Sequence, residues 1–486
     1  MVHDLLIIGG GINGCAIARE AALNGLKVLL VERDDLASHT SSASTKLIHG
    51  GLRYLEQYDF RLVAEALRER ERLVHAAPHL IRPMRFVLPH EHAVRPWWLV
   101  RAGLVLYDVI GGRMSLPRSR GLRRGDTAYT APLRGGRRGF VYSDAFVDDS
   151  RLTLANALDA AANGAEIATR TALESARREG DVWRVHLSDG REVTARALVN
   201  AAGPWVEEAL GRLGVNARGG VRLVKGSHIV VPRMYEGDHA YILQQPDRRI
   251  VFAIPYLDRF TEIGTTDVPV ERPEDAVIAP DEVDYLCDAV NRHFTTQIAP
   301  SDVASSWSGV RPLYDDGASE AQVVSRDYVL ELDGTVLNVF GGKITTGRHL
   351  AEEALAKLAP VMGWSITQVT RDRPFPGGDI GDFTAFLAEV RARWPWLGEA
   401  RSARMAHAYG STLFAMLDGL GPDAPQVAGL LEAELCWMHG HEWARTAEDM
   451  LKRRSKLDLT LTPEERAHVE RWWEANFPSP VQEGGS

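Results

Sequence analysis

The clearest pattern of apolar and polar positions lies at the start of the chain. The apolar run Asp4–Ile8 predicts a buried parallel strand, and a glycine-rich turn follows over residues 9–14. Residues 15–24 then carry apolar side chains at helical spacing, and residues 27–31 form a second apolar run that closes with Glu32. This pattern predicts one β-α-β unit.

Farther along the chain, the pattern changes from helical to strand-like. Helical spacing predicts helices over Phe60–Ala76 and 151–163, and alternation over 183–199 predicts a hairpin that turns at Ser188-Asp189-Gly190. Residues 220–340 alternate short strand-like runs with turns. This long stretch therefore predicts a large antiparallel sheet.

The last third of the chain returns to helical spacing. A strand over 335–340 passes through Gly341-Gly342 into a helix over 345–358, and helices are expected from Asp379 onward. This C-terminal part holds six of the twelve tryptophans, at positions 394, 396, 437, 443, 472 and 473. We expect it to pack a core of its own.

Composition excludes several classes of protein. The 486 residues are 45% hydrophobic and 25% charged, as in a soluble globular protein with several structural units. A net charge of -9 argues against nucleic acid as a partner. The three cysteines, at positions 15, 287 and 436, are too far apart in sequence for a zinc motif or a disulfide framework, and we expect no metal site.

Two features bear on where the protein resides. The longest nearly apolar stretch, Trp97–Tyr107, contains Arg101 and is shorter than a membrane-spanning helix. The N-terminus has Asp4 where a signal peptide would be basic. A cytoplasmic protein is expected, with contact to a membrane surface left open.

The turn at residues 9–14 has the spacing of a dinucleotide-binding motif. Gly9 permits the tight turn, Gly11 lets a pyrophosphate approach the backbone, and Gly14 allows close packing of the helix. The helix N-terminus faces the phosphates with its partial positive charge, and Glu32 can accept hydrogen bonds from a ribose diol. The unit therefore predicts a bound dinucleotide.

The surrounding segments favour FAD over a nicotinamide cofactor. A nicotinamide-binding domain would continue with regular β-α-β units, whereas here a hydroxyl-rich loop occupies residues 40–51. The stretch Asn200–Trp205 resembles the second dinucleotide-contacting strand of glutathione-reductase-like FAD enzymes, and Gly341-Gly342-Lys343 offers a third contact at a helix start.

Five longer strings carry a family resemblance, at residues 41–55, 225–230, 263–267, 308–312 and 340–346. They resemble the signature of FAD-dependent glycerol-3-phosphate dehydrogenases, and most of all the aerobic, quinone-linked bacterial enzymes. The resemblance extends over nearly the whole chain. It implies a flavoprotein of glycerol metabolism that oxidises sn-glycerol 3-phosphate to dihydroxyacetone phosphate. Hydride would pass from C2 to N5 of FAD, and electrons would pass to membrane quinone in respiratory electron transfer.

The resemblance also implies an α/β architecture in three parts. A glutathione-reductase-like FAD-binding domain is expected over 1–80, 140–220 and 330–378. An antiparallel, β-rich substrate domain is expected over 81–139 and 221–329, and an all-α cap over 379–486. The cofactor-binding residues that this implies are Gly9, Gly11, Asn13, Gly14, Glu32, Ser41, Ser42, Ser44, Thr45, Lys46, His49, Ala172, Gly203, Trp205, Gly342, Lys343 and Thr345.

A phosphate dianion in a partly dry pocket needs several fixed cations, and arginine forks match its oxygens. By resemblance, Arg53, Arg311 and Lys343 bind the phosphate and hydroxyl groups, Tyr54 adds a hydroxyl, and Arg326 adds a further cation. Arg311 and Lys343 are also expected beside the reacting atoms.

Oxidation of a secondary alcohol needs a base for the hydroxyl proton. His49 and His228 are the candidates whose ordinary pKa suits that task. Either could instead only hydrogen-bond flavin or backbone, and a perturbed Arg or Lys is a further option. The base is left unassigned.

Residues 95–138 suit a membrane interface. Between Arg113 and Arg138, eight arginines (113, 118, 120, 123, 124, 134, 137 and 138) accompany one acid, Asp126, and the tryptophans 97 and 98 precede them. Aromatic and basic side chains favour lipid headgroups, so we expect peripheral attachment to the cytoplasmic face of the inner membrane. A solvated arginine-rich loop is the other interpretation.

Other functions remain open. A glycerol-3-phosphate oxidase that uses O2 would carry the same motifs. An amine or amino-acid oxidase, or a non-catalytic flavin-binding regulator, is less favoured because neither needs three cations for a dianion. Relatives of this kind are often dimeric, so a homodimer is possible.

One departure from the family pattern is Gly347, where an aromatic residue usually precedes the arginine at position 348. This departure puts the local packing and the start of the helix in doubt.

Overall fold

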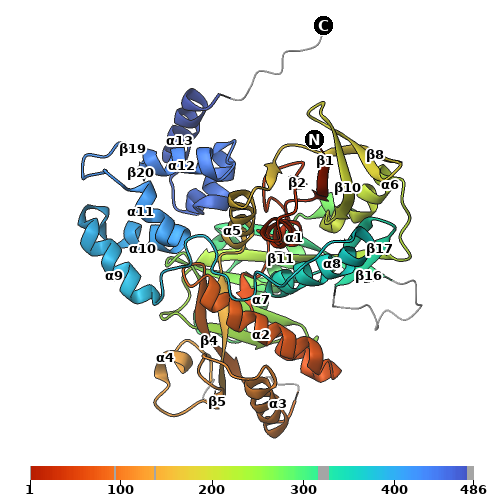
Figure 1. Ribbon diagram of the computed structural model, residues 1–486. Coiled ribbons are helices and arrows are strands. Elements are labelled where there is room, and N and C mark those ends of the chain that lie inside the picture. Colours follow the sequence, from red (N-terminus) through yellow and green to blue (C-terminus); the bar gives the residue numbers. More distant parts are fainter. Residues whose placement is uncertain (1, 92–94, 136–137, 316–327, 479–486) are drawn as a thin grey trace.

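The computed structural model describes residues 2–91, 95–135, 138–315 and 328–478 (Figure 1). Two mixed β-sheets form the centre of this part of the chain, helices cover their faces, and a group of C-terminal helices packs beside them. The chain thus has an α/β fold.

The first sheet contains the expected β-α-β unit. β1 (Val2–Ile8) is parallel to both β2 (Val28–Val31) and β10 (Glu192–Asn200), so that Leu5 pairs with Val28 on one side and Ala197 on the other. The remaining strands are β7 (Glu166–Ala168), β8 (Leu173–Glu179), β9 (Val182–Leu187), β17 (Val329–Asp333) and β18 (Val336–Phe340). The strand order along the sheet is β17-β18-β10-β1-β2-β7. β9 and β10 form the predicted hairpin, and β8 pairs with the other edge of β9.

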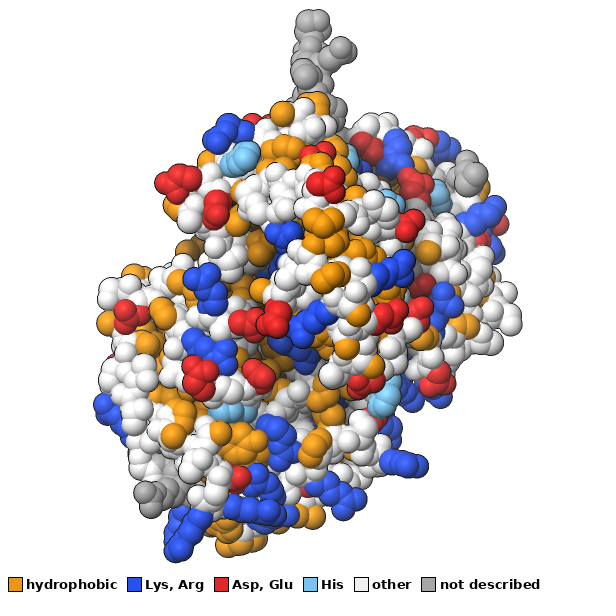
Figure 2. All heavy atoms as spheres, turned by 90° about the vertical axis from the view of Figure 1, so that its left-hand side faces the viewer, with side chains coloured by type: hydrophobic (Ala, Val, Ile, Leu, Met, Phe, Trp, Pro, Cys, Tyr) orange, Lys and Arg blue, Asp and Glu red, His pale blue; other side chains and the backbone are white. Residues whose placement is uncertain are grey.

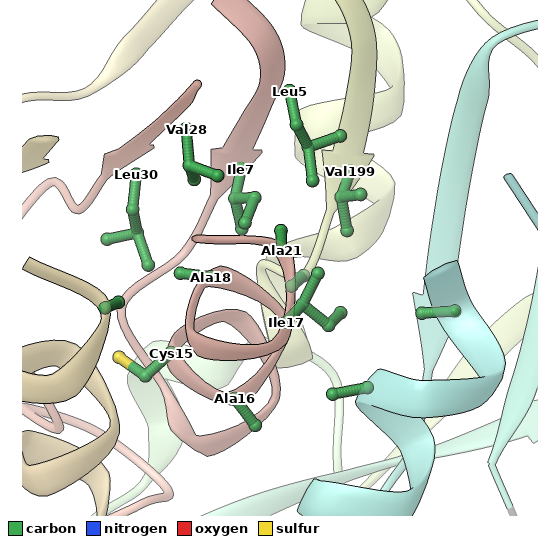
Figure 3. Close-up of a cluster of buried hydrophobic side chains, with 14 of the residues drawn as sticks. Leu5, Ile7, Cys15, Ala16, Ile17, Ala18, Ala21, Val28, Leu30 and Val199 are labelled. Atoms are coloured by element: carbon green, nitrogen blue, oxygen red, sulfur yellow. The ribbon is translucent and has the colours of Figure 1, made fainter. Parts of the chain in front are cut away.

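Three helices cover one face of this sheet. α1 (Ile12–Leu23), α5 (Asp149–Ala162) and α8 (Gly347–Met362) share an apolar cluster with β1, β2, β10 and β18. Figure 3 shows that α1 presents Ala18, Ala21 and Ile17 to Leu5 and Ile7 on β1. Small side chains let the helix approach closely and bring its N-terminus to the end of β1. On the opposite face, side chains of β1, β2 and β10 share a second apolar cluster with β8, β9 and α6 (Val206–Leu213).

The second sheet has the strand order β15-β11-β14-β13-β12-β4-β6-β3, with β16 on β11 and β5 on β6. The predicted antiparallel strands are β11 (Gly220–Pro232), β12 (Ala240–Gln244), β13 (Ile250–Tyr256), β14 (Phe260–Gly264), β15 (Val268–Val270) and β16 (Ser305–Asp315). The sheet is mixed because β12 is parallel to β4 (Ile81–Pro89).

Two details of the sheet prediction are wrong. The stretch 220–340 also contains α7 (Pro280–Asn291), whose apolar side lies on the sheet, and the prediction missed it. In addition, the antiparallel stretch ends before residue 340, because β17 and β18 belong to the first sheet, where β18 pairs in parallel with β10. This membership agrees with the FAD-binding part expected over 330–378. Short apolar runs do not reveal which partner strand they will meet.

The boundary expected at residue 140 also differs from the sheet pairing. β6 (Gly139–Val147) pairs along its whole length with β4 in the second sheet, and β3 (Leu47–Ile48) pairs with β6. β5 (Arg120–Gly121) joins β6 from the other side. The loop that precedes β3 therefore connects the two sheets, which is where the candidate site lies.

Helices α2 (Phe60–Ala76) and α3 (Trp97–Ile110) cover the second sheet on the side opposite α7. The predicted helix over Phe60–Ala76 is confirmed. α3 and the short helix α4 (Thr127–Thr130) lie at the lower end of the molecule in Figure 1.

The C-terminal helices pack a core of their own, as expected. They are α9 (Phe383–Arg393), α10 (Gly398–Tyr409), α11 (Leu413–Met416), α12 (Glu432–His441) and α13 (Pro463–Asn476), with a small hairpin of β19 (Gln426–Val427) and β20 (Leu430–Leu431). Trp394 and Trp473 are buried in this core, whereas Trp443 packs against the core of the first sheet. A buried ion pair of 2.6 Å between Arg151 and Glu442 links the cap to α5.

No helix within the described ranges has the length and hydropathy that crossing a bilayer would require.

Candidate functional site

A cavity lies at the carboxyl ends of strands β1, β2 and β10 of the first sheet. Predicted residues that line it are Gly9, Gly11, Asn13, Glu32, Ser41, Ala172, Gly203, Trp205 and Gly342. The cavity is thus built from segments far apart in the sequence, and the parallel strands bring them to one edge.

The turn after β1 excludes side chains. Gly9 has a positive φ of 111°, and a Cβ there would lie 2.5 Å from the carbonyl oxygen of Ala201. A Cβ on Gly14 would lie 2.0 Å from the carbonyl oxygen of Gly9, and one on Gly11 would lie 3.1 Å from Oγ of Ser41. The turn therefore leaves an open backbone face at the start of α1, which suits a pyrophosphate.

Glu32 supports this turn. Its carboxylate accepts hydrogen bonds from the backbone N–H of Gly10 at 2.6 Å and of Asp34 at 2.8 Å. Burial raises the pKa of Glu32, and the two backbone hydrogen bonds oppose that rise. The side chain lines the cavity, so the expected contact with a ribose stays a prediction.

Asn13 connects the turn to the third glycine segment. Its Nδ2 donates to the carbonyl oxygen of Gly341 at 3.0 Å, whereas its buried Oδ1 has no hydrogen-bond partner within the described ranges. Gly342 has a φ of 99°, and a Cβ there would lie 2.5 Å from Nδ2 of Asn13. A glycine cradle with an unpaired buried acceptor fits a ligand that carries N–H or O–H groups, as FAD does.

The hydroxyl-rich loop joins this cradle to the second sheet. Oγ of Ser41 accepts from the backbone N–H of Ile12 at 2.9 Å, at the start of α1. On the other side, the hydroxyl of Thr40 donates to the carbonyl oxygen of Val310 on β16 at 2.8 Å. The loop is thus fixed between the two sheets.

Some loop residues that were expected to bind the cofactor direct their side chains to protein groups. The hydroxyl of Ser44 donates to Asp149 at 2.8 Å, and Nζ of Lys46 lies 3.0 Å from both carboxylate oxygens of Asp149. The hydroxyl of Ser42 donates to the carbonyl oxygen of His39. These contacts organise the loop. The Ser42 and Ser44 hydroxyls keep acceptor lone pairs, so their expected contact with the cofactor stays a prediction.

Lys343 and Tyr54 form a second group. Nζ of Lys343 lies 4.3 Å from the centre of the Tyr54 ring, and this buried nitrogen has no hydrogen-bond partner within the described ranges. Gly51 lets the ring lie there, because a Cβ on it would approach the ring to 2.3 Å. A buried ammonium without a hydrogen bond is costly, so it points to a ligand with an acceptor oxygen.

His49 lies beside this group. Its backbone N–H donates to Oγ1 of Thr345 at 3.3 Å, and its ring Nδ1 accepts from the N–H of Gly51 at 3.1 Å. Burial lowers the pKa of His49. Asp144 opposes this, and Lys343 reinforces it. The ring is therefore neutral at pH 7.

His228 is held on several sides. Its Nε2 lies 2.9 Å from Oγ1 of Thr45, and its ring stacks on Trp307 with centroids 5.6 Å apart. Burial, together with the positive charges of Lys46 and Arg311, lowers the pKa of His228 to about 3. Trp307 was not predicted as a neighbour of His228, because the two residues meet only by strand pairing.

The arginines expected at the substrate differ in their surroundings. Arg311 forms an ion pair of 2.5 Å with Asp267, and its side chain is 43% exposed. Arg53 is partly buried. Arg326 lies outside the described residues.

Residues missed by the sequence reasoning surround Trp205. Arg33 lies over the Trp205 ring at 4.1 Å, and the His39 ring lies 4.5 Å from it; both line the cavity.

Gly347, the departure from the family pattern, does not disturb the start of the helix that follows. Gly347 is the first residue of α8, and Arg348 pairs with Glu69 and Glu352.

The chain is similar to known proteins of one family. Residues 4–352 match the family model described as FAD dependent oxidoreductase. Glycerol-3-phosphate dehydrogenase of Pseudomonas aeruginosa is 49% identical, over 98% of this chain and 96% of that protein. D-erythritol 1-phosphate dehydrogenase of Brucella abortus is 47% identical, over 97% of each chain.

A solved structure agrees with these matches. The glycerol-3-phosphate dehydrogenase from Bacillus halodurans, complexed with FAD, has a TM-score of 0.79 and 26% sequence identity, and covers 99% of this chain and 92% of that chain. The glycine cradle and the unpaired acceptor of Asn13 fit the same cofactor. The chain therefore belongs to the family of FAD-dependent oxidoreductases that includes the glycerol-3-phosphate dehydrogenases.

Proposed function

We propose that this protein is a quinone-linked dehydrogenase that oxidises sn-glycerol 3-phosphate to dihydroxyacetone phosphate. The observation that carries the proposal is the buried Nζ of Lys343, which has no hydrogen-bond partner within the described ranges and lies over the ring of Tyr54. An ammonium in that position is stabilised by an anionic or hydroxyl oxygen of a bound substrate. The relatives at 47–49% identity act on polyol phosphates by name.

Three arginines would join Lys343 in binding the substrate under this proposal. Arg53 and Arg311 supply guanidinium groups for the phosphate, Tyr54 supplies a hydroxyl, and Arg326 adds a further cation. Arg311 would exchange its exposed ion pair with Asp267 for the phosphate, which is a favourable exchange because a dianion offers more acceptor oxygens.

The proposed cofactor contacts follow the cavity. The glycine turn and the start of α1 bind the pyrophosphate, Glu32 and Ala172 bind the adenosine end, and Gly203 and Trp205 close the cavity. The flavin end lies toward Gly342, Lys343, Thr345 and the loop 40–51. Bound FAD would supply the two-electron acceptor for the C2 hydride.

We also propose a functional division of the chain. The first sheet and its helices bind FAD, the second sheet contributes Arg311 to the substrate site, and the helices after residue 379 cap the two. Under this division the loop 40–51 brings cofactor and substrate together, since it contacts both α1 and β16.

Helix α3 is the proposed site of membrane contact. Its apolar residues Trp97, Trp98, Leu99, Val105 and Val109 are exposed, and Trp98 exposes 69% of its surface. Figure 2 shows Lys and Arg side chains together with apolar ones at the lower end of the molecule, where α3 and α4 lie in Figure 1. Exposed tryptophans beside arginines suit an anionic headgroup layer, where a lipid-soluble quinone is reached.

The test is an anaerobic titration of the FAD-loaded protein with sn-glycerol 3-phosphate, followed by the visible absorbance of oxidised flavin. Bleaching is expected, and its absence with flavin still bound would refute the proposed substrate. Adding a quinone or O2 to the reduced protein then separates a dehydrogenase from an oxidase. Fast reoxidation by O2 alone would reject the quinone assignment.

A second substrate deserves the same titration. The 47% identity to a D-erythritol 1-phosphate dehydrogenase covers 97% of each chain, so a longer polyol phosphate is a candidate. The rate of flavin reduction is measured at several concentrations of D-erythritol 1-phosphate and of sn-glycerol 3-phosphate. The substrate with the larger rate per unit concentration has the preferred chain length.

A further inference from the structure

Glu262 is a buried carboxyl group that the proposed reaction does not yet use. It lies on β14 in the interior of the second sheet, where it is 0% exposed. Neither of its two carboxylate oxygens has a hydrogen-bond partner within the described ranges. Since a buried carboxyl without hydrogen bonds is costly, its presence calls for a role.

The nearest titratable neighbour is His228. The two residues lie on adjacent strands, because Glu262 pairs with Val230 and His228 pairs with Gly264. They therefore occupy diagonal positions on one face of the sheet. Oε1 of Glu262 lies 3.9 Å from Nε2 of His228.

The position of the His228 ring is fixed closely. A Cβ on Gly264 would lie 2.0 Å from the ring carbon Cδ2, so only glycine allows the ring to lie across this strand. Thr45 contacts Nε2, Trp307 stacks on one face of the ring, and Nδ1 is buried without a partner within the described ranges. The ring thus presents one engaged nitrogen and one unengaged nitrogen.

These contacts favour one tautomer. When the proton resides on Nε2, it points toward the Thr45 oxygen and the Glu262 carboxyl, and Nδ1 is left with a lone pair. An ionised Glu262 stabilises this tautomer and any imidazolium that forms from it. It thereby opposes burial, Lys46 and Arg311, which lower the pKa of His228 to about 3. The arrangement follows the general scheme of a histidine base oriented by a carboxylate.

We propose that Glu262 is a positioning residue for His228, and that His228 takes the hydroxyl proton of the substrate on Nδ1. This inference rests on the proposed function. In the step, the O–H bond of C2 breaks and its proton moves to Nδ1 while the carbonyl forms. The electron pair of the C2–H bond leaves as hydride to the acceptor that the family's cofactor supplies, so atoms and electrons balance.

The charged and titratable groups that face Glu262 come from four elements. They are Lys46 of the loop, Asp149 of α5, His228 of β11 and Tyr256 of β13. Lys46 is already neutralised by Asp149. Burial raises the pKa of Glu262 to about 8, which Lys46 opposes and Asp149 reinforces. Glu262 therefore changes charge near the pH at which the enzyme would work.

His49 lacks such a partner. Its Nδ1 already accepts from the N–H of Gly51, and the nearby carboxylate of Asp144 is engaged by Arg70 and Tyr107 at 2.7 and 2.8 Å. Of the two histidines left open by the sequence, the geometry thus favours His228 as the base and leaves His49 to position the loop.

The test measures the rate constant of anaerobic flavin reduction by sn-glycerol 3-phosphate from pH 6 to pH 10. For the unchanged protein we expect a rise with pH that levels off above the pKa of Glu262. Glu262→Gln should lose this rise and lower the plateau about tenfold or more, with little change in substrate affinity. Glu262→Asp keeps a carboxyl and should restore the pH dependence. Glu236→Gln, at an exposed carboxylate, is the matched control.

The outcomes separate this inference from the proposed function. If the unchanged protein is not bleached, the proposed substrate is wrong. If it is bleached and Glu262→Gln keeps the same pH dependence, Glu262 does not act through His228. Infrared spectra give a readout without turnover. In the unchanged protein, a band of a protonated carboxyl group should be present at pH 6 and absent at pH 9. Glu262→Gln should lack this band at both pH values, and its presence in that variant would overturn the inference.

Discussion

The substitution Glu262→Gln is expected to change how stability depends on pH. The folded protein keeps a proton on Glu262 up to a pKa of about 8, whereas in the unfolded chain the group has its ordinary pKa of 4.5. Below pH 4.5 the group is neutral in both states and contributes nothing. Between pH 4.5 and pH 8 only the unfolded chain releases the proton, so unfolding becomes progressively more favourable. Glutamine has no such proton.

The size of the effect follows from the two pKa values. A difference of 3.5 units corresponds to about 5 kcal/mol above pH 8, at about 1.36 kcal/mol per unit, and to about 3 kcal/mol at pH 7. The group is fully buried, so solvent does not screen the effect. Glu262→Gln should therefore gain stability over the unchanged protein as the pH rises.

Thermal unfolding of the FAD-loaded proteins measures this difference. The apparent Tm of Glu262→Gln minus that of the unchanged protein should grow by several degrees between pH 5 and pH 8. Glu236→Gln should show a constant difference over the same range. A Tm difference for Glu262→Gln that is equal at both pH values would refute the reasoning, since it would mean that Glu262 does not hold its proton in the fold.

Four further variants test the proposed sites. Lys343→Met should keep FAD but slow flavin reduction by sn-glycerol 3-phosphate about 100-fold or more, because the buried cation is lost; near-normal reduction would remove Lys343 from the site. Arg311→Ala should raise the KM for the substrate sharply, as steady-state kinetics would detect. Glu32→Ala should lose flavin on dialysis without a change in substrate preference, because the turn at Gly10 loses its acceptor. Trp98→Glu should reduce sedimentation with anionic vesicles and leave flavin reduction unchanged.

Local sequence determined the elements that bind a dinucleotide. Neighbouring residues determine the succession of a strand, a glycine turn, a helix and an acidic residue. β1, α1 and β2 form where the pattern predicts them, and Glu32 follows β2 as expected. Helix α2 begins and ends at the predicted residues. Such features depend on apolar periodicity and on turns that only glycine can adopt, both of which are legible in the sequence.

The partner of each strand was not legible in the same way. β6 was assigned to the FAD-binding domain by its position along the chain, yet it pairs with β4 in the second sheet. Helix α7 was missed inside a strand-rich stretch. An apolar run of five residues fits either sheet, and its partner is decided by long-range packing.

The sequence by itself determined the cofactor class and a set of candidate residues, because glycines, hydroxyl groups and arginines in ordered strings signal their chemistry directly. It left His49 and His228 equivalent, since both have the same intrinsic pKa. Only the tertiary structure places Thr45, Trp307 and Glu262 around His228, by pairing strands that are far apart in the chain. Burial and neighbouring charges then give two identical side chains different surroundings, and these are properties of the folded molecule rather than of the residue types.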